Sequence, residues 1–104
     1  MVSKENDVRV VRIYITEGDH KVRSLMGMLH DEEKVSGVTV FRGISGFGKS
    51  GTLHTSKLID LSFDLPLVIE FFDEPERIAE VLERLGEKIE PVHVISWPAK
   101  TNLG

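Results

Sequence analysis

Apolar positions along this chain repeat with two periods, and the period changes in a definite order. From Val8 to Thr16 the apolar residues alternate, which predicts a strand. Between Lys21 and about Lys34 four apolar residues recur at helical spacing and predict a helix: Val22, Leu25, Met26 and Leu29. Ser36 and Gly37 end this helix, and Val38 to Arg42 alternates again as a second strand.

The second half of the chain repeats this order. Residues 65–72 predict a third strand, and Asp73 with Glu76 predicts a capped helix start. Five residues form the inward stripe of this helix: Ile78, Val81, Leu82, Leu85 and Ile89. Pro91 ends it, and residues 92–97 predict a last short strand. The order β-α-β-(long loop)-β-α-β predicts an α+β, ferredoxin-like βαββαβ sandwich with both helices on one face of an antiparallel sheet.

Both faces of the predicted sheet are apolar. One face collects alternate residues of the strands: Val11, Ile13, Ile15, Val38, Val40, Leu67, Ile69, Phe71, Val92 and Val94. The other collects Val10, Tyr14, Phe41, Val68, Phe72, Ile95 and Trp97. Two helices cover one face only, so the second face predicts a homo-oligomer packed through the sheet. The alternative is that the long connection folds back over that face through Leu53, Leu58, Ile59, Leu61 and Phe63.

Length and composition are those of one globular domain. The chain has 104 residues, of which 40% are hydrophobic and 29% charged, with a formal net charge of −4. We expect a single domain over residues 8–97, flanked by a flexible N-terminus (1–7) and a flexible C-terminal tail (98–104). The chain has no cysteine, no apolar stretch typical of a signal peptide and no run long enough to span a bilayer, so we expect a cytoplasmic protein.

Residues 43–50 match the phosphate-loop pattern G-x-x-x-x-G-K-[ST]. Such a loop follows a strand and opens a helix, whose N-terminus faces the phosphates. The strand is present in the sequence, but Ser50 runs into Gly51-Thr52-Leu53-His54-Thr55, which has no helical pattern. No acidic residue suited to holding magnesium follows either. The motif therefore does not predict a nucleotide hydrolase.

The glycine-rich loop (residues 42–57) still has the chemistry of an anion site. It contains no Asp or Glu, since none occurs between Glu33 and Asp60, whereas the rest of the chain is acidic. Glycines permit close backbone approach to a ligand, and basic side chains supply charge. The candidate ligand-binding residues are Arg42, Gly43, Gly46, Gly48, Lys49, Ser50, His54 and Lys57. The alternative is a flexible hairpin loop whose lysines keep it soluble.

Several other polar residues are candidate sites. The four histidines have no zinc-ligand spacing and there is no cysteine, so no metal site is predicted. His54 is either a phosphate or ribose ligand or a solvent-exposed loop residue. Glu70 lies among apolar neighbours on a central strand, where a structural ion pair with Arg12 or Arg42 is favoured over a general base.

Two aromatic residues raise the question of nucleic acid. Tyr14 beside Arg12 is compatible with base stacking on a ferredoxin-like sheet. The negative net charge and the placement of Gly46-Phe47-Gly48 in a loop argue against it. Trp97 is more typical of an interface anchor, and we predict no nucleic-acid partner.

The combined motifs resemble a known family. The stretches Thr39–Gly43, Gly46–Gly51, His54–Leu58 and Asp64–Glu70, with Arg12-Ile13-Tyr14-Ile15, are similar to the PII-like domain of unknown function 190 family, over about Val8 to Ser96. The resemblance implies a ferredoxin-like trimer of the PII superfamily, with nucleotides in clefts between subunits and a long loop that contacts a partner. The glycine-rich loop occupies the position of that loop. We find no clear match after Ile89 to the distal basic ligand residues of PII signalling proteins.

Two functions follow as hypotheses. The first is a regulatory, signal-transduction module that binds an adenine nucleotide (ATP, ADP or AMP) or a similar phosphorylated molecule between subunits. Its loop then engages a protein target such as a transporter or an enzyme. The second is a phosphate-loop hydrolase or transferase that uses Lys49 and Ser50. Such an enzyme needs an acidic residue that holds magnesium and a residue that positions water, and the sequence offers neither. We therefore expect no enzymatic activity.

Overall fold

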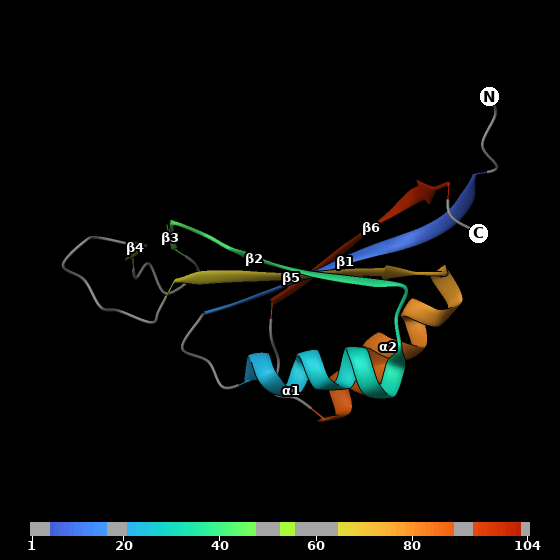
Figure 1. Cartoon of the computed structure of the whole chain (residues 1–104), viewed down its shortest axis with the longest axis horizontal. Coiled ribbons are helices and arrows are strands. Elements are labelled where there is room, and N and C mark those ends of the chain that lie inside the picture. Colours follow the sequence, from blue (N-terminus) through green and yellow to red (C-terminus); the bar gives the residue numbers. More distant parts are fainter. Residues whose placement is uncertain (1–4, 17–20, 48–52, 56–64, 89–92, 103–104) are drawn as a thin grey trace.

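A four-stranded antiparallel sheet forms one layer of the protein and the helices form the other (Figure 1). The computed structural model describes residues 5–16, 21–47, 53–55, 65–88 and 93–102. The sheet consists of β1 (Asn6–Thr16), β2 (Gly37–Arg42), β5 (Pro66–Asp73) and β6 (His93–Thr101), in the order β2-β5-β1-β6. All three strand pairs are antiparallel. The predicted ferredoxin-like α+β fold is confirmed.

The first helical segment differs from the prediction of one regular helix over residues 21–34. It is an α-helix, α1 (Lys21–Gly27), followed directly by a π-helical segment, η1 (Met28–Glu33). The change occurs at Gly27, the residue with the weakest helical preference in the segment. Lys34 ends η1 in the left-handed conformation with φ of 52°, and its backbone N–H donates to the Leu29 carbonyl.

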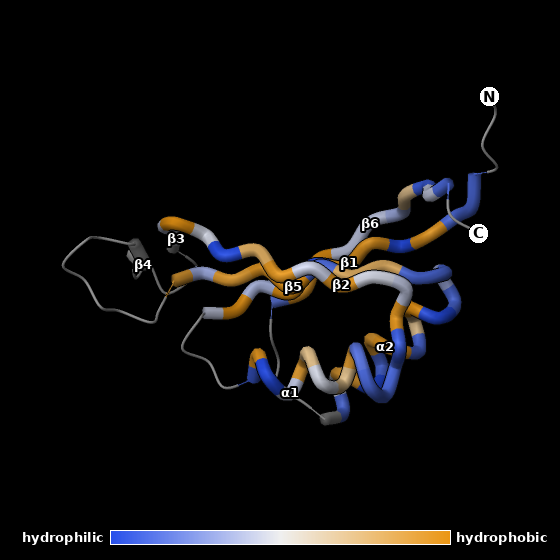
Figure 2. Tube along the Cα trace, in the orientation of Figure 1, coloured by the Kyte–Doolittle hydropathy of each residue, from blue (hydrophilic) through white to orange (hydrophobic). Residues whose placement is uncertain are grey.

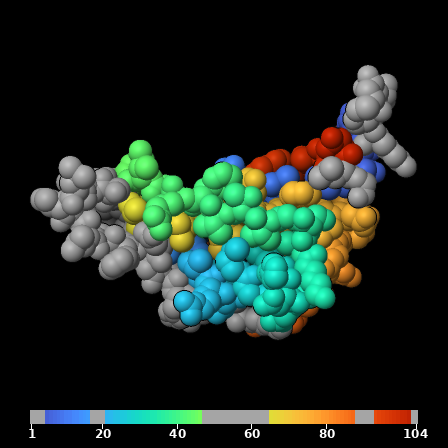
Figure 3. Space-filling view, in the orientation of Figure 1, coloured from blue at the N-terminus to red at the C-terminus, as the bar shows by residue number. Residues whose placement is uncertain are grey.

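The core lies between the sheet and the helices α1, η1 and α2 (Pro75–Lys88). Figure 2 shows apolar residues along the middle of β1, β2 and β5, above the helices. In the space-filling view β2 and the α1–η1 segment form one continuous surface (Figure 3). The buried cluster contains Val11, Ile13, Ile15, Leu25, Met28, Leu29, Leu67, Ile69, Phe71, Ile78, Val81 and Leu85. The helix-covered face is therefore the one predicted from alternation in the first and third strands.

A buried carboxylate joins the two helical segments. Glu33 at the end of η1 is 5% exposed and accepts two hydrogen bonds from Arg84 of α2, at 2.7 Å from Nε and 2.6 Å from Nη2. Arg77 Nη1 lies 3.4 Å from the same carboxylate. The hydrogen bonds from Arg84 hold the pKa of Glu33 below its ordinary value of 4.5. We call Glu33, Arg77 and Arg84 the helix clasp.

Asp73 connects the start of β2 to the start of α2. Its two carboxylate oxygens accept hydrogen bonds from the backbone N–H groups of Glu74 (2.8 Å) and Ser36 (3.2 Å). The helix begins at Pro75, whose missing N–H costs nothing at a first helical position. The predicted capping pair of Asp73 and Glu76 is therefore wrong in detail, because Asp73 lies one residue before the N-cap position.

The last strand is longer than predicted. We expected it to end at Trp97 before a flexible tail, but residues 98–101 continue β6 and pair with β1 back to Asn6 and Asp7. Pro98 lies within this extension, and proline lacks the N–H that a central strand requires. Among the described strands β6 is at the edge of the sheet, with β1 as its one neighbour, and an edge strand tolerates proline.

The glycine-rich loop contains a small hairpin that the sequence did not predict. Its strands are β3 (Ser45–Phe47) and β4 (Leu53–Thr55), which pair in a separate two-stranded sheet. Figure 1 shows this hairpin beyond the end of the main sheet, next to the end of β2. Its strands are only three residues each, too short for the alternation that identifies strands in a sequence.

Candidate functional site

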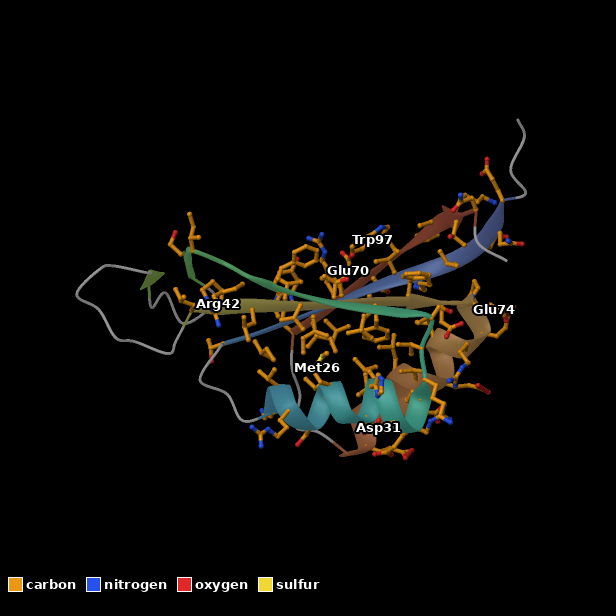
Figure 4. All side chains as sticks on the ribbon, viewed as in Figure 1. Met26, Asp31, Arg42, Glu70, Glu74 and Trp97 are labelled. Carbon is orange, nitrogen blue, oxygen red and sulfur yellow. The ribbon has the colours of Figure 1, made fainter. Side chains whose placement is uncertain are left out.

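The glycine-rich loop starts where β2 ends, and the structure describes part of the predicted site. Arg42 is the last residue of β2, exposed and close to the hairpin (Figure 4). Gly43 follows it, Gly46 is in β3, and His54 is in β4, where it pairs with Gly46. The other four candidates, Gly48, Lys49, Ser50 and Lys57, lie outside the described residues. Their role as ligands stays a prediction.

Gly43 has a structural task at the base of this loop. Its backbone N–H donates to the Pro66 carbonyl at 2.7 Å, which ties the loop to the start of β5. A Cβ atom at Gly43 would lie 2.7 Å from Pro66 Cγ and 3.3 Å from the Pro66 carbonyl oxygen. Glycine is therefore required for this close approach. The backbone N–H of Gly43 therefore already has a partner within the chain.

We expect Gly43→Ala to lower the free energy of unfolding by about 1–3 kcal/mol, because the added methyl group overlaps the Pro66 ring. The matched control is Gly86→Ala in α2, where an added Cβ meets nothing within 4 Å. That change should raise stability by up to about 1 kcal/mol, since alanine is the better helix former. Denaturant unfolding of both variants gives the comparison. Equal effects of the two changes would contradict the packing role of Gly43.

The loop does not have the architecture of a hydrolase phosphate loop. In that architecture a helix begins at the Lys-Ser pair, and its N-terminus faces the phosphates. Here residues 53–55, shortly after that pair, form the strand β4, which pairs back to β3. Because residues 53–55 form a strand, they cannot belong to the helix that this architecture requires after the Lys-Ser pair. The phosphate-loop hypothesis is thereby weakened by geometry as well as by sequence.

The face of the main sheet opposite the helices is a second candidate site. We call it the open face, and its residues are Val10, Arg12, Tyr14, Thr39, Phe41, Val68, Glu70, Phe72, His93, Ile95 and Trp97. Among the elements that the structure describes, none covers it, and Figure 4 shows Glu70 and Trp97 on the side of the sheet away from α1. Phe41 is 46% and Ile95 41% exposed. The alternative covering segment is mostly outside the described residues, namely Leu58, Ile59, Leu61 and Phe63.

An ion pair lies in the middle of the open face. Arg12 on β1 and Glu70 on β5 are direct cross-strand partners, and Arg12 Nε donates to Glu70 Oε1 at 2.7 Å. The predicted ion pair for Glu70 is confirmed, with Arg12 as its partner. The guanidinium lies 5.8 Å from the ring centre of Phe41 and 5.5 Å from that of Trp97. Hydrogen bonding to Glu70 raises the pKa of Arg12, so it is a permanent cation.

Tyr14 and His93 form an aromatic pair at one end of the open face. Their ring centres are 5.3 Å apart, and they are neighbours across β1 and β6. Tyr14 is two residues from Arg12 on the same face of β1. The sequence analysis treated His93 as one of four dispersed histidines. The register of the first and last strands was the signal that would have placed it beside Tyr14.

The other end of the sheet is unsuited to phosphate. A cleft of about 650 Å³ lies where β1 begins and β5 ends, and four of its lining residues are acidic: Asp7, Asp73, Glu74 and Glu76. Negative side chains repel phosphate, so an anionic ligand is favoured at the basic loop end instead.

Among the described residues, no three His, Asp or Glu side chains form a group that could hold a metal ion. No described helix has the length and apolar character needed to cross a bilayer.

Sequence comparison identifies the family. The model of DUF190, described as an uncharacterised ACR, matches residues 8–101. The chain belongs to the DUF190 family. The UPF0166 protein MJ1524 of Methanocaldococcus jannaschii is 36% identical over 85 residues, which is 78% of this DUF190 chain and 78% of that protein. A UPF0166 protein of Aquifex aeolicus is 42% identical over 57 residues, and this match spans 55% of the chain but only 54% of that protein's length.

Solved structures with the same fold include PII-like proteins. CPII of Thiomonas intermedia K12, described as a nitrogen regulatory PII-like protein bound to ADP, AMP and bicarbonate, has a TM-score of 0.72 and 17% identity to this DUF190 chain. The comparison covers 98% of the chain and 94% of CPII. A PII-like signaling protein of Thermus thermophilus has a TM-score of 0.57 at 18% identity, covering 94% and 90% of the two chains. At this identity the likeness establishes a PII-like fold.

Proposed function

We propose that this protein is a PII-like regulatory module rather than an enzyme. Copies associate through the open face, as a trimer, and an adenine nucleotide or similar phosphorylated molecule binds in the clefts between them. The observation that carries the proposal is a basic, glycine-rich loop attached to one end of an apolar sheet face that no described element covers. The likeness in fold to CPII, which was solved with ADP and AMP, supports the choice of ligand.

The ligand site is proposed at the loop end of the sheet. Arg42, Lys49 and Lys57 supply positive charge, Ser50 and His54 supply hydrogen bonds, and Gly46 and Gly48 permit close backbone approach. Gly43 holds the loop against Pro66. Nucleotide occupancy then biases the arrangement of the loop, which engages a protein target such as a transporter or an enzyme in the cytoplasm. The net charge of −4 and the carboxylate of Glu70 on the open face disfavour nucleic acid as a partner.

The test is calorimetric titration of ATP, ADP and AMP into the wild type and Lys49→Ala. We expect saturable binding of at least one nucleotide, weakened about tenfold or more in the variant, because a charged phosphate contact is worth about 1.5–3 kcal/mol. The matched control is Lys100→Ala, which removes the same charge at the far end of the sheet, where Lys100 pairs with Asp7. Binding to this control should equal that of the wild type.

Phosphate release over hours distinguishes the two function classes. The regulatory module binds ATP and releases no phosphate above the blank. Steady release that is lost in Lys49→Ala would instead establish the hydrolase hypothesis. If none of the three nucleotides binds to the wild type, the proposed ligand class is wrong.

A further inference from the structure

The Arg12–Glu70 pair leaves hydrogen-bonding capacity unused on the open face. Among the described residues, the hydrogen bond that joins the two side chains runs from Arg12 Nε to Glu70 Oε1 at 2.7 Å. A guanidinium has five N–H donors and a carboxylate has two acceptor oxygens, so both groups can make further bonds. Their side chains are 38% and 27% exposed. The remaining donors and acceptors are therefore accessible from this face.

Apart from Thr39, the cross-strand neighbour of Glu70 on β2, the surroundings of the pair are mainly apolar and aromatic. Phe41 and Trp97 lie within 6 Å of the guanidinium carbon on β2 and β6, the two outer strands. Covering the face therefore removes water from a cation and a carboxylate at its centre. Such desolvation is unfavourable unless the partner supplies matching hydrogen bonds and charges. A purely apolar partner supplies none, and a polyanion would oppose Glu70.

A second copy of this chain supplies both charges. Arg12 and Glu70 are adjacent, opposite in sign and balanced, so Arg12 of one copy can face Glu70 of the next copy around a closed ring. We propose that the Arg12–Glu70 pairs of neighbouring copies meet across the interface and set the register in which the copies associate. This inference rests on the proposed association through the open face. It adds the residues that select the partner and its orientation.

Charge reversal tests the inference directly. The Arg12→Glu chain carries two carboxylates at this point and the Glu70→Arg chain carries two guanidinium groups, so each chain repels its own copies. We expect each variant alone to associate about a hundredfold more weakly than the wild type in sedimentation equilibrium. Mixed in equal amounts, the two should associate more strongly than either does alone, because two of the three contacts in a mixed trimer then join opposite charges.

The matched control uses another ion pair between strands. Asp7 and Lys100 pair across β1 and β6, but their side chains are 70% and 62% exposed and lie near the end of the sheet. Asp7→Lys and Lys100→Glu make charge reversals of the same size. We expect both to associate as the wild type does, because screened surface charges contribute little.

The outcomes separate this inference from the proposed function. A wild type that sediments as single chains overturns both. A wild type that associates while Arg12→Glu and Glu70→Arg associate equally well overturns the inference alone, and so does a mixture that stays dissociated although circular dichroism shows both variants folded. If a reversal prevents folding, Arg12→Gln and Glu70→Gln are compared instead. Each should weaken association about tenfold, and unchanged association of both overturns the inference.

Discussion

Phe71→Ala is expected to lower the free energy of unfolding by about 3–5 kcal/mol, a large part of the stability of a domain of this size. Phe71 is on β5, is 0% exposed and is the largest fully buried side chain among the described residues. It faces the helices beside its cross-strand partners Val11 and Val38. Replacing the ring with a methyl group leaves a cavity that the sheet and α2 cannot close. Denaturant unfolding at several protein concentrations measures the loss.

The control is Phe41→Ala, which removes the same ring from the opposite side of the sheet. Phe41 is 46% exposed, so its replacement should cost the single chain about 1 kcal/mol or less. The effect of Phe41→Ala should instead appear in association, because the ring lies on the open face. Similar losses of single-chain stability for the two variants would mean that the helices do not cover the Phe71 side preferentially.

Glu33→Gln is expected to lower the free energy of unfolding by about 2–3 kcal/mol at neutral pH. The substitution keeps the shape of the side chain but removes the charge that holds Arg84 and Arg77 in the helix clasp. The carboxylate is buried, whereas the side chain of Arg84 is 41% exposed, so water compensates part of the loss. The matched control is Asp31→Asn, which breaks an exposed ion pair with His30 and should cost about 0.5 kcal/mol or less.

The helix clasp also predicts a pH dependence. The pKa of Glu33 is lower in the folded chain than its ordinary value of 4.5, so its contribution to stability is complete above about pH 4.5. That contribution is lost as the pH falls through the lower, folded value. The stability difference between the wild type and Glu33→Gln should therefore shrink on acidification from about pH 7 to about pH 3. A constant difference over this range would show that charge on Glu33 is not what stabilises the clasp.

Local patterns predicted the sheet and its two faces. Alternation in Val11, Ile13 and Ile15 identified the buried side of β1, and the same period placed Phe41 and Trp97 on the open face. Glu70 could be assigned a partner because an acid within an apolar central strand requires one, and Arg12 proved to be its cross-strand neighbour. These features depend on the alternation of side chains between the two faces of a strand. This alternation is visible within a few residues of sequence.

Features that depend on contacts between distant segments were not predicted. The sequence analysis gave Glu33 no structural role, although it continues the stripe of Leu25 and Leu29 at intervals of four. Its burial becomes understandable only with Arg77 and Arg84 of α2 in place. The hairpin β3–β4 escaped prediction because its strands are three residues long. Of the loop site, the structure describes the anchoring of Gly43, whereas the binding roles of Lys49, Ser50 and Lys57 depend on experiment.

The composition of β6 has a consequence for solubility. An outer strand presents backbone groups to which foreign strands can add, and such addition leads to fibrils. Pro98 interrupts the row of amide donors on this strand, and the exposed ammonium group of Lys100 discourages an incoming chain. Pro98 and Lys100 thus protect this edge of the sheet from uncontrolled strand addition.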